Sequence, residues 1–276
     1  DVAWFLSSSR GAGWLRTWSE GMRSFADDVT PVILTGDEER NIRRTLAQLQ
    51  WAREVVVCDS FSGDRTVEIA HSFPNVRVVQ RRFDDLAAQW TFAFSETTTE
   101  WILALDADYY VPTEFSQELA ALRPTRETSA FEASFVYAIN GRSLRGSLYP
   151  PHPVVLRRDR VEVSMDGHAQ RFLVTGQTSK MIASLVHDDR KSLRRFIKRQ
   201  KSYMRQEAAK IRSADPRTLN ATARIRRLRV VAPLVIVPYV LLGKGLIFDG
   251  LAGLRYSFER LVAELILSLE LFRPSR

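Results

Sequence analysis

Short apolar runs alternate with stretches of helical periodicity in the first 110 residues of the chain. Four runs predict β-strands, at residues 31–35, 54–58, 76–79 and 101–105. The stretches between them, with apolar residues three or four positions apart, predict helices at 37–49, 64–70 and 83–95. Each strand is a continuous apolar run, which is typical of strands buried on both faces. The alternation predicts an α/β fold with a mostly parallel central sheet and helices on both faces.

The pattern changes after residue 130. Three further strands are predicted at Phe131–Ile139, Val154–Arg158 and Met181–Val186, with polar, glycine-containing stretches between them. A long basic helix is predicted from Arg190 to Arg212. The thirteen uncharged residues 230–242 follow, interrupted by two prolines, and an apolar-striped helix is predicted over 258–272. A membrane-crossing helix needs roughly 20 apolar residues, so the uncharged run is too short by itself.

The N-terminal segment carries Trp14, Trp18, Met22 and Phe25 on one helical face. We expect this face to pack on the protein's own core, with membrane contact as the alternative. The first residues show no basic and apolar pattern of a secretory signal. The predicted organisation is an N-terminal amphipathic segment at 1–28, a catalytic domain at 29–190 and C-terminal helices at 191–276.

Charge is distributed unevenly. The net charge is +8, but residues 190–229 hold 15 lysines and arginines against two acids, so this block carries +13 and the rest −5. A basic helix followed by broken apolar segments favours attachment to an anionic membrane surface, either lying on it or re-entering it. An ordinary helical cap on the core is the alternative. Nucleic-acid binding predicts interleaved aromatic residues, and the block has only Phe196 and Tyr203.

Cysteine and histidine content excludes two classes of site. The single Cys58 excludes a disulfide framework and a multi-cysteine zinc site, and is compatible with a reducing compartment. The four histidines do not have a zinc-binding spacing.

Two carboxylates end the apolar run at residues 101–105. Asp106 and Asp108 are separated by one residue, and like charges so close resist joint ionisation. A divalent cation removes this conflict, and hard oxygen ligands suit Mg²⁺ or Mn²⁺. Polar residues also follow the first two strands, at 35–39 and 59–64, and open α/β sheets bind ligands at such strand ends. The pattern predicts a nucleotide diphosphate held through a metal, with a chance solvated strand end as the alternative.

Other nucleotide motifs are missing from the sequence. No Gly-x-Gly-x-x-Gly follows a strand, and no Gly-x-x-x-x-Gly-Lys-Ser/Thr occurs, which argues against dinucleotide-binding and P-loop folds. Asp64 is expected to cap the helix that follows it rather than to contact a ligand.

Three sequence motifs together resemble one enzyme family. Residues 31–42 (PVILTGDEERNI), 54–66 (EVVVCDSFSGDRT) and 101–108 (WILALDAD) resemble a family 2 glycosyltransferase of the GT-A fold. The similarity covers about residues 30–200, and it is nearest to the group that includes lipopolysaccharide core β-glucosyltransferases. Two positions depart from the family pattern, because Asp37 replaces an asparagine and Tyr109 replaces a glutamate.

The resemblance implies roles at the matching positions. Nucleoside contacts are implied for Thr35, Glu38 or Glu39, and Asp59. A place near the ribose and sugar is implied for Asp106, and metal ligation for Asp106, Asp108 and His187. Donor contacts are implied for Gln89, and a contact with the diphosphate for Arg190, whose fork suits phosphate oxygens. The neighbouring Trp90 is as well explained by a place in the core.

Inverting sugar transfer also needs a base for the acceptor hydroxyl. Asp166 is the first candidate and His168 the second, since the glutamate that relatives carry near this point is absent here. A hydrogen bond within the loop is the alternative for each.

The resemblance thus implies a metal-dependent inverting glycosyltransferase that uses Mg²⁺ or Mn²⁺. The expected donor is a nucleotide-diphosphate sugar, UDP-linked in the first instance. The expected acceptor is a glycolipid or lipid-linked saccharide of lipopolysaccharide-core type, at the cytoplasmic face of a bacterial inner membrane. Alternatives are a nucleotidyltransferase, a phosphatase with a nucleophilic aspartate, or a basic nucleic-acid-binding module; nucleic acid is not an expected partner, and a homo-oligomer stays open.

Overall fold

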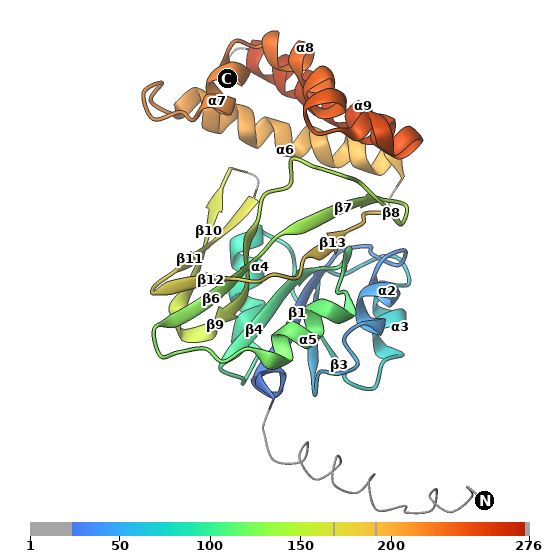
Figure 1. Cartoon of the computed structure of the whole chain (residues 1–276), viewed down its shortest axis with the longest axis vertical. Coiled ribbons are helices and arrows are strands. Elements are labelled where there is room, and N and C mark those ends of the chain that lie inside the picture. The colour runs from blue at the N-terminus through green and yellow to red at the C-terminus, as the bar shows by residue number, and fades with distance from the viewer. Residues whose placement is uncertain (1–23, 168, 191, 274–276) are drawn as a thin grey trace, which may run out of the picture.

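An α/β domain lies under a separate layer of C-terminal helices (Figure 1). The computed structural model describes residues 24–167, 169–190 and 192–273. Most of the predicted N-terminal helical face, with Trp14, Trp18 and Met22, therefore lies outside the described residues. The described end of that segment is a 3-10 turn, Phe25–Asp28, and the Phe25 ring packs edge-on against Trp101 at 5.2 Å between centroids.

The central sheet has seven strands in the order β12-β6-β9-β4-β1-β2-β3. Their bounds, in that order, are Gln177–Lys180, Thr128–Ala133, His152–Arg157, Trp101–Asp106, Val29–Thr35, Val55–Asp59 and Val76–Gln80. Strand β1 is parallel to β2 and β4, and β2 is parallel to β3. Strand β9 runs antiparallel to both of its neighbours. The predicted mostly parallel sheet is confirmed.

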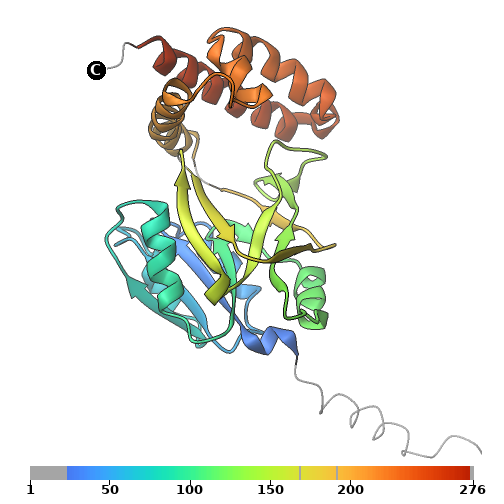
Figure 2. The same ribbon diagram turned by 90° about the vertical axis from the view of Figure 1, so that its left-hand side faces the viewer.

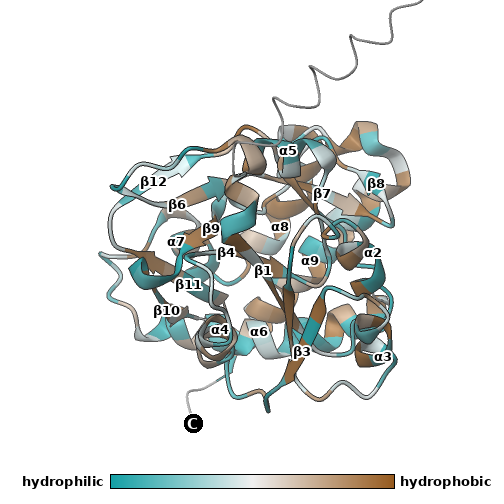
Figure 3. Cartoon of the chain, turned by 90° about the horizontal axis from the view of Figure 1, so that it is seen from below, coloured by the Kyte–Doolittle hydropathy of each residue, from teal (hydrophilic) through white to brown (hydrophobic). Residues whose placement is uncertain are grey.

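Alternation along the strands divides the core into two layers. Val55 and Val57 join a cluster with helices α2 (Ile42–Ala47), α3 (Thr66–His71) and α5 (Thr113–Ala121). Val56 and Cys58 face the other way, toward α4 (Leu86–Ser95). Successive side chains of a strand point to opposite faces, so continuous apolar runs are needed to fill both layers. Figure 3 shows hydrophobic residues along β1 and β4 and hydrophilic ones along the edge strand β12.

The chain changes sheets at Ser134. The single strand predicted over 131–139 is two strands, β6 and β7 (Phe135–Ile139), which belong to different sheets. Strand β7 lies in a four-stranded sheet with the order β5-β13-β7-β8, where β5 is Tyr109–Tyr110, β13 is Leu185–His187 and β8 is Arg142–Ser143. The predicted strand over 181–186 is wrong for residues 181–184, which form an irregular link between β12 and β13.

A hairpin that the sequence patterns did not predict covers α4. Its strands are β10 (Val161–Asp166) and β11 (Ala169–Val174), and it follows the 3-10 turn Arg158–Arg160. The ring of Phe172 packs edge-on against Trp90 at 5.6 Å between centroids, which places Trp90 in the core. Figure 2 shows the hairpin rising from the sheet toward the C-terminal helices.

The described part of the C-terminal layer contains four helices and two shorter turns. They are α6 (Leu193–Ser213), α7 (Ala221–Arg227), α8 (Val231–Pro238), the π-helical turn Tyr239–Gly243, the 3-10 turn Leu246–Asp249 and α9 (Gly250–Phe272). The predicted basic helix is thus α6, and it packs along α9. In the described part of the chain no single helix is long and apolar enough to cross a membrane. Val231–Gly243 and Leu246–Phe272 meet that criterion only as a pair, bent by 74°.

Helix α9 departs from the usual distribution of polar and apolar residues, because it exposes apolar side chains on one face and buries charged as well as apolar ones on the other. Large apolar side chains lie exposed along one side, and we call Leu251, Leu254, Phe258, Leu265, Leu269 and Phe272 the α9 stripe. Their spacing of three, four or seven places them on one face. The opposite, buried face holds Glu259, Glu264 and two serines. Arg226 of α7 forms an ion pair with Glu264 at 2.5 Å, which compensates the buried charge.

Candidate active site

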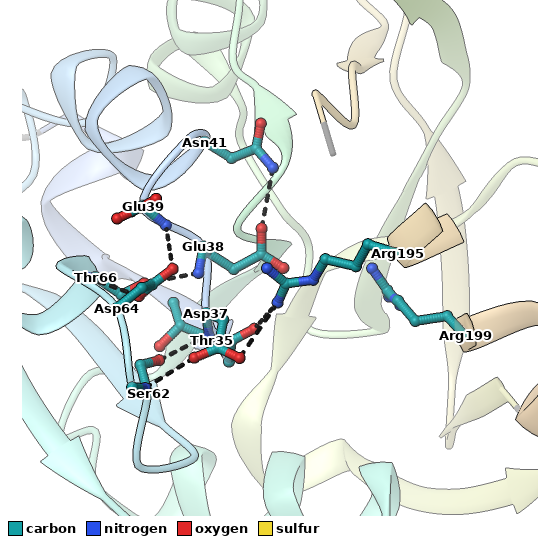
Figure 4. Close-up of polar contacts among 12 residues, drawn as sticks. Thr35, Asp37, Glu38, Glu39, Asn41, Ser62, Asp64, Thr66, Arg195 and Arg199 are labelled. Atoms are coloured by element: carbon teal, nitrogen blue, oxygen red, sulfur yellow. Dashed lines mark hydrogen bonds and ion pairs between the residues drawn. The ribbon is translucent and has the colours of Figure 1, made fainter. Parts of the chain in front are cut away.

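The loops that follow β1 and β2 bind each other at the carboxyl edge of the sheet (Figure 4). The Asp37 carboxylate accepts a hydrogen bond from the Gly63 amide at 2.8 Å, and the Asp37 amide donates to the Ser62 hydroxyl at 2.8 Å. Asp37 adopts a left-handed backbone with φ 56°, a conformation that aspartate tolerates better than most residues. The two predicted strand-end motifs therefore form one rim, as parallel neighbours should.

Two further contacts extend this rim. The Glu38 amide donates to the Thr66 hydroxyl at 2.6 Å, and the Glu39 amide donates to Asp64 at 3.2 Å. Asp64 also accepts from the Thr66 amide at 2.9 Å, but the N-cap of α3 is Arg65, so Asp64 lies one residue before the predicted capping position. The Glu38 carboxylate is buried and accepts from Asn41 at 3.0 Å, whereas Glu39 is exposed at the rim.

Asp59 is the anchor of this rim. Its carboxylate is fully buried and accepts hydrogen bonds from the Thr35 hydroxyl at 3.0 Å, the Ser62 amide at 2.9 Å and the Gln80 amide group at 3.0 Å. The Ser62 hydroxyl donates a fourth. A carboxylate with this many donors holds the loop in place, and a contact with a nucleoside stays a prediction for Thr35 and Asp59.

Gln89 is also engaged within the protein. Its side-chain amide donates toward the Cys58 thiol at 3.3 Å and the Ser60 hydroxyl at 3.2 Å, and its carbonyl accepts from Arg81 at 2.9 Å. Burial raises the pKa of the Cys58 thiol to about 11, so Cys58 is a neutral core residue. Gln89 thus links α4 to the end of β2 through hydrogen bonds. Its predicted contact with the sugar donor is untested.

The turn with Asp106 and Asp108 is held from α2. The Thr45 hydroxyl lies 2.7 Å from the carbonyl oxygens of both Ala107 and Tyr109. This contact fixes the backbone between the two carboxylates, and it joins residues 62 and 64 positions apart in the chain. Sequence reasoning did not single out Thr45, because a threonine inside a predicted helix carries no local signal for a contact with a distant turn.

Pairing between two short strands brings His187 to Asp108. Strand β13 is antiparallel to β5 with His187 opposite Tyr109, and the His187 Nε2 lies 3.5 Å from Asp108 Oδ2. Burial, followed by the charge of Asp108, raises the pKa of Asp106. For His187, burial acts to lower the pKa, but Asp108 and then Asp106 outweigh it and raise the pKa above its usual value.

The side chains of Asp108 and His187 suit a divalent cation that is bound together with a diphosphate. Asp108 and His187 offer one carboxylate and one imidazole, a combination that accepts Mn²⁺ or Mg²⁺. The Nδ1 of His187 is buried and has no hydrogen-bond partner among the described residues. Within those residues, no group of three His, Cys, Asp or Glu side chains could hold a metal by itself. Mg²⁺ commonly takes one or two carboxylates and completes its shell with phosphates and water, so this incomplete set fits.

The cations that face the rim come from α6 rather than from Arg190. Arg195 donates to the Gly36 carbonyl at 2.9 Å and lies 3.6 Å from the Asp37 carboxylate (Figure 4). Arg199 lies one turn further on the same face. Burial acts to lower its pKa, but Tyr203 and then the charge of Asp108 outweigh burial and raise the pKa. Sequence reasoning missed both arginines, although their spacing of four on a basic helix was a usable signal.

Arg190 points into a different ion-pair cluster. Its Nε donates to the buried Asp188 carboxylate at 2.9 Å, and Arg44 of α2 pairs with the same carboxylate. Arg44 also donates to the Asp188 carbonyl at 2.7 Å. This cluster supports the turn just after His187, and the predicted contact of Arg190 with a diphosphate is untested.

Comparison with known proteins settles the family. Residues 31–183, more than half of the chain, match the profile of glycosyl transferase family 2. The chain belongs to this family. The phosphatase, nucleotidyltransferase and nucleic-acid alternatives lose their support with that match.

Individual relatives of this family 2 chain are distant. An uncharacterized glycosyltransferase of Rickettsia bellii is 34% identical over 92 residues, which is 33% of this chain and 31% of that protein. The match thus spans about a third of the relative's length. A Pyrobaculum calidifontis mannosyltransferase solved with GDP-Man and Mn²⁺ has a TM-score of 0.50 at 16% identity, over 93% of this chain and 92% of that one. S. aureus TarS with UDP-GlcNAc has a TM-score of 0.47 at 14% identity, over 86% and 89%. The predicted GT-A fold is confirmed.

The predicted catalytic base lies at the tip of the β10–β11 hairpin in this family 2 fold. The Asp166 carboxylate forms an ion pair with Lys210 of α6. Lys210 follows Arg199 by eleven positions, which is roughly 16 Å along a helix. His168, the second candidate, is outside the described residues. The role of either residue as base stays a prediction.

An aromatic cluster links the candidate site to α9. The hydroxyls of Tyr109 and Tyr149 lie 2.5 Å apart, and Tyr137 packs edge-on against both His187, at 4.8 Å, and Tyr256 of α9, at 4.9 Å. Burial raises the pKa of Tyr109 well above its usual value, so its hydroxyl stays protonated beside Asp106. Tyr109 therefore supplies a neutral ring and a hydrogen-bond donor to this cluster.

Proposed function

We propose that this family 2 chain is a metal-dependent, inverting glycosyltransferase that takes its sugar from a nucleotide-diphosphate sugar, with UDP-sugars as the first candidates. The observation that carries the proposal is the Asp108–His187 pair, next to the interlocked loops at the carboxyl edge of the sheet. The mannosyltransferase of similar fold was solved with GDP-Man and Mn²⁺, which supports a nucleotide sugar and a divalent cation.

The side chains around this edge divide the work on the donor. Asp108 and His187 would hold the cation, with Asp106 beside them, and the cation when bound neutralises charge on the leaving diphosphate. Arg195 and Arg199 of α6 supply fixed positive charge over the same edge, where phosphate oxygens would lie. The rim around Thr35 and Asp59 would receive the nucleoside.

The transfer step requires a group that takes the proton of the acceptor hydroxyl. We retain Asp166 as the first candidate and His168 as the second. Asp166 would have to exchange Lys210 for the acceptor, and the hairpin that carries it is anchored by Phe172 on α4 rather than by α6. A general base of this kind contributes about 10²–10⁴-fold to the rate.

We further propose that the acceptor is a glycolipid of lipopolysaccharide-core type, presented at the cytoplasmic face of a bacterial inner membrane. The support comes from the C-terminal layer, residues 191–276 in the predicted organisation. The α9 stripe exposes leucines and phenylalanines while glutamates are buried on the opposite face, an arrangement expected of a helix whose outer solvent is lipid.

Further exposed apolar side chains adjoin the stripe in the sequence. They lie on α8 and the two turns that follow it, at Leu234, Val235, Tyr239, Leu242, Ile247 and Phe248. Fully burying one leucine or phenylalanine contributes about 1.5–3 kcal/mol, so a dozen partly exposed ones exceed what peripheral attachment requires. The +13 balance of residues 190–229 suits an anionic surface beside them.

A donor panel tests the central proposal. The melting temperature of the protein is measured with UDP-, GDP-, ADP- and CMP-sugars, each with and without Mn²⁺. We expect one nucleotide class to stabilise the protein only when Mn²⁺ is present, because the cation needs the diphosphate as a ligand and the diphosphate needs the cation. Absence of Mn²⁺-dependent stabilisation by every sugar nucleotide would contradict the proposal.

A further inference from the structure

An open hollow lies between the α/β domain and the C-terminal helices, beside the candidate site. Its volume is about 390 Å³, and its wall includes Arg40, Arg190, Arg255, Asn140, Leu193 and Phe258. These residues come from the turn before α2, the turn after β7, the turn after β13, and the two helices α6 and α9. The hollow is therefore formed where all of these elements meet.

The polar part of the hollow is cationic. Three guanidinium groups line it, and no carboxylate is among the described residues of its wall. Two buried acids pair with two of these arginines, since Arg190 Nε lies 2.9 Å from Asp188 and Arg255 Nε lies 3.1 Å from Glu259. Ion pairs at the Nε edge fix the orientation of a guanidinium, and fixed forks recognise phosphate oxygens well.

The first turn of α6 adds to the same field. Ser192, which also lines the hollow, is the N-cap of this 21-residue helix, and Leu193 is its first residue. The amide groups at a helix N-terminus carry partial positive charge and favour anions. The arginines and the N-terminus of α6 therefore both favour a ligand with concentrated negative charge.

The remaining part of the hollow is apolar and continues into the α9 stripe. Phe258 lines the hollow and is also a member of the stripe, and both Phe258 and Leu193 are exposed. A ligand in the hollow would thus place its charge among the arginines and its apolar part along the helix face. Arg190 follows His187 by three residues, so the charged end would lie near the proposed metal ligands.

We propose that this hollow binds the terminal phosphate group of a membrane-anchored lipid, and that it is the phosphate-binding part of the acceptor site. The inference rests on the proposed function for its link to sugar transfer. The lipid-phosphate chemistry itself rests on the three arginines, the α6 N-terminus and the apolar side that leads to the stripe.

Vesicle binding tests this inference with the full chain. Sedimentation is compared for phosphatidylcholine vesicles that contain phosphatidic acid, which exposes a terminal phosphate, or phosphatidylglycerol, which does not, at matched surface charge. The test variant is Arg40→Gln with Arg255→Gln. The control is Arg126→Gln with Arg160→Gln, two exposed arginines away from the hollow that remove the same net charge.

We expect the test variant to lose about tenfold in affinity for phosphatidic acid vesicles and less than about twofold for phosphatidylglycerol vesicles. The control should lose less than about twofold for both. Equal losses for both lipids, or equal losses in test and control, would mean general charge attraction and overturn the inference. Inorganic phosphate is a further arm, and full displacement of the protein from phosphatidic acid vesicles by millimolar phosphate would overturn the lipid part.

Donor binding separates this inference from the proposed function. Stabilisation by a UDP-sugar with Mn²⁺ is measured in the same variants and should be unchanged, because neither Arg40 nor Arg255 belongs to the donor rim. Preference for phosphatidic acid without any donor binding would sink the proposed function and leave the lipid-phosphate site standing. Donor binding without a preference for phosphatidic acid would overturn the lipid-phosphate site and leave the proposed function standing.

Discussion

The α/β domain and the C-terminal helical layer differ in where they place apolar side chains: the central strands bury theirs, whereas α9 buries some and exposes a whole stripe. In β4 every residue from Trp101 to Leu105 is buried, and the first polar side chain, Asp106, lies at the ligand edge. In α9 Leu251 is 81% exposed while Glu264 is only 6% exposed. The strands of the first region thus place their apolar side chains in the protein's own core. The second has a face that water does not suit, which is why a bilayer is the partner we propose for it.

The carboxylates of the α/β domain show a related contrast. Asp59 is fully buried and accepts four hydrogen bonds from the protein, so its charge is used to hold a loop. Asp108 instead meets an imidazole, and its neighbour Asp106 has a raised pKa. Repulsion between two neighbouring carboxylates is typical of a functional site, where a bound cation compensates their charges.

The largest expected effect comes from Asp108→Ala. Loss of a metal ligand should lower kcat/KM about 10³-fold and abolish Mn²⁺-dependent stabilisation by the donor. Thermal shift and turnover are measured on the same preparation. The unliganded melting temperature should not fall, because the variant also relieves repulsion with Asp106. Normal metal-linked donor binding in this variant would place the metal elsewhere.

A pair of leucine truncations tests the contrast between the two regions directly. Leu103→Ala, in the fully buried β4, should lower the free energy of unfolding by about 2–5 kcal/mol. Leu251→Ala, in the exposed α9 stripe, should change it by less than about 0.5 kcal/mol. Both are measured by denaturant unfolding in the absence of lipid. Comparable losses in the two variants would mean that the stripe is covered by protein in solution.

Asp166→Ala separates binding from transfer. Without the proposed base, turnover should fall about 10²-fold, while stabilisation by the donor with Mn²⁺ stays at the level of the parent protein. Asp166→Asn serves as the matched variant that keeps the side-chain volume. Near-normal turnover in both would move the base elsewhere, with His168 as the next residue to replace.

The smallest expected effect concerns membrane binding by the stripe. Leu251→Ser combined with Leu254→Ser should weaken binding to anionic vesicles about tenfold, because two exposed side chains lose their transfer into lipid. Stabilisation by donor and Mn²⁺ should not change. Serine substitution at Phe61, an exposed aromatic residue of the loop after β2, provides a control for loss of any surface apolar group. Vesicle binding that is insensitive to the stripe variant would leave the basic helix as the attachment.

Most of the α/β domain could be predicted from the sequence, because its signals are local. The four parallel strands, and the three helices between them, occur where apolar runs and helical periods indicated. The strand predicted over 181–186 is confirmed only at 185–186, because residues 181–184 link two sheets, and no local period distinguishes a link from a strand. The β10–β11 hairpin was missed since its polar strands gain their stability from packing on α4.

The acidic residues of the candidate site could be predicted from the sequence, but the arginines that face them could not. Asp106, Asp108 and the rim residues follow strands directly, and parallel strands bring their ends to one edge. Arg195 and Arg199 reach that edge only because α6 crosses over it, and Thr45 supports the turn from a helix more than 60 residues earlier. Such contacts depend on how elements pack, which short-range patterns do not encode.

The sequence by itself determined the order of strands and helices, the glycosyltransferase motifs and the position of the basic block, since each depends on residue types at fixed local spacing. Only the tertiary structure decided that His187 meets Asp108, that Asp59 is saturated by its own protein, and that the apolar face of α9 points outward. Those outcomes depend on which surfaces pack together in the folded chain and on which apolar surface stays exposed.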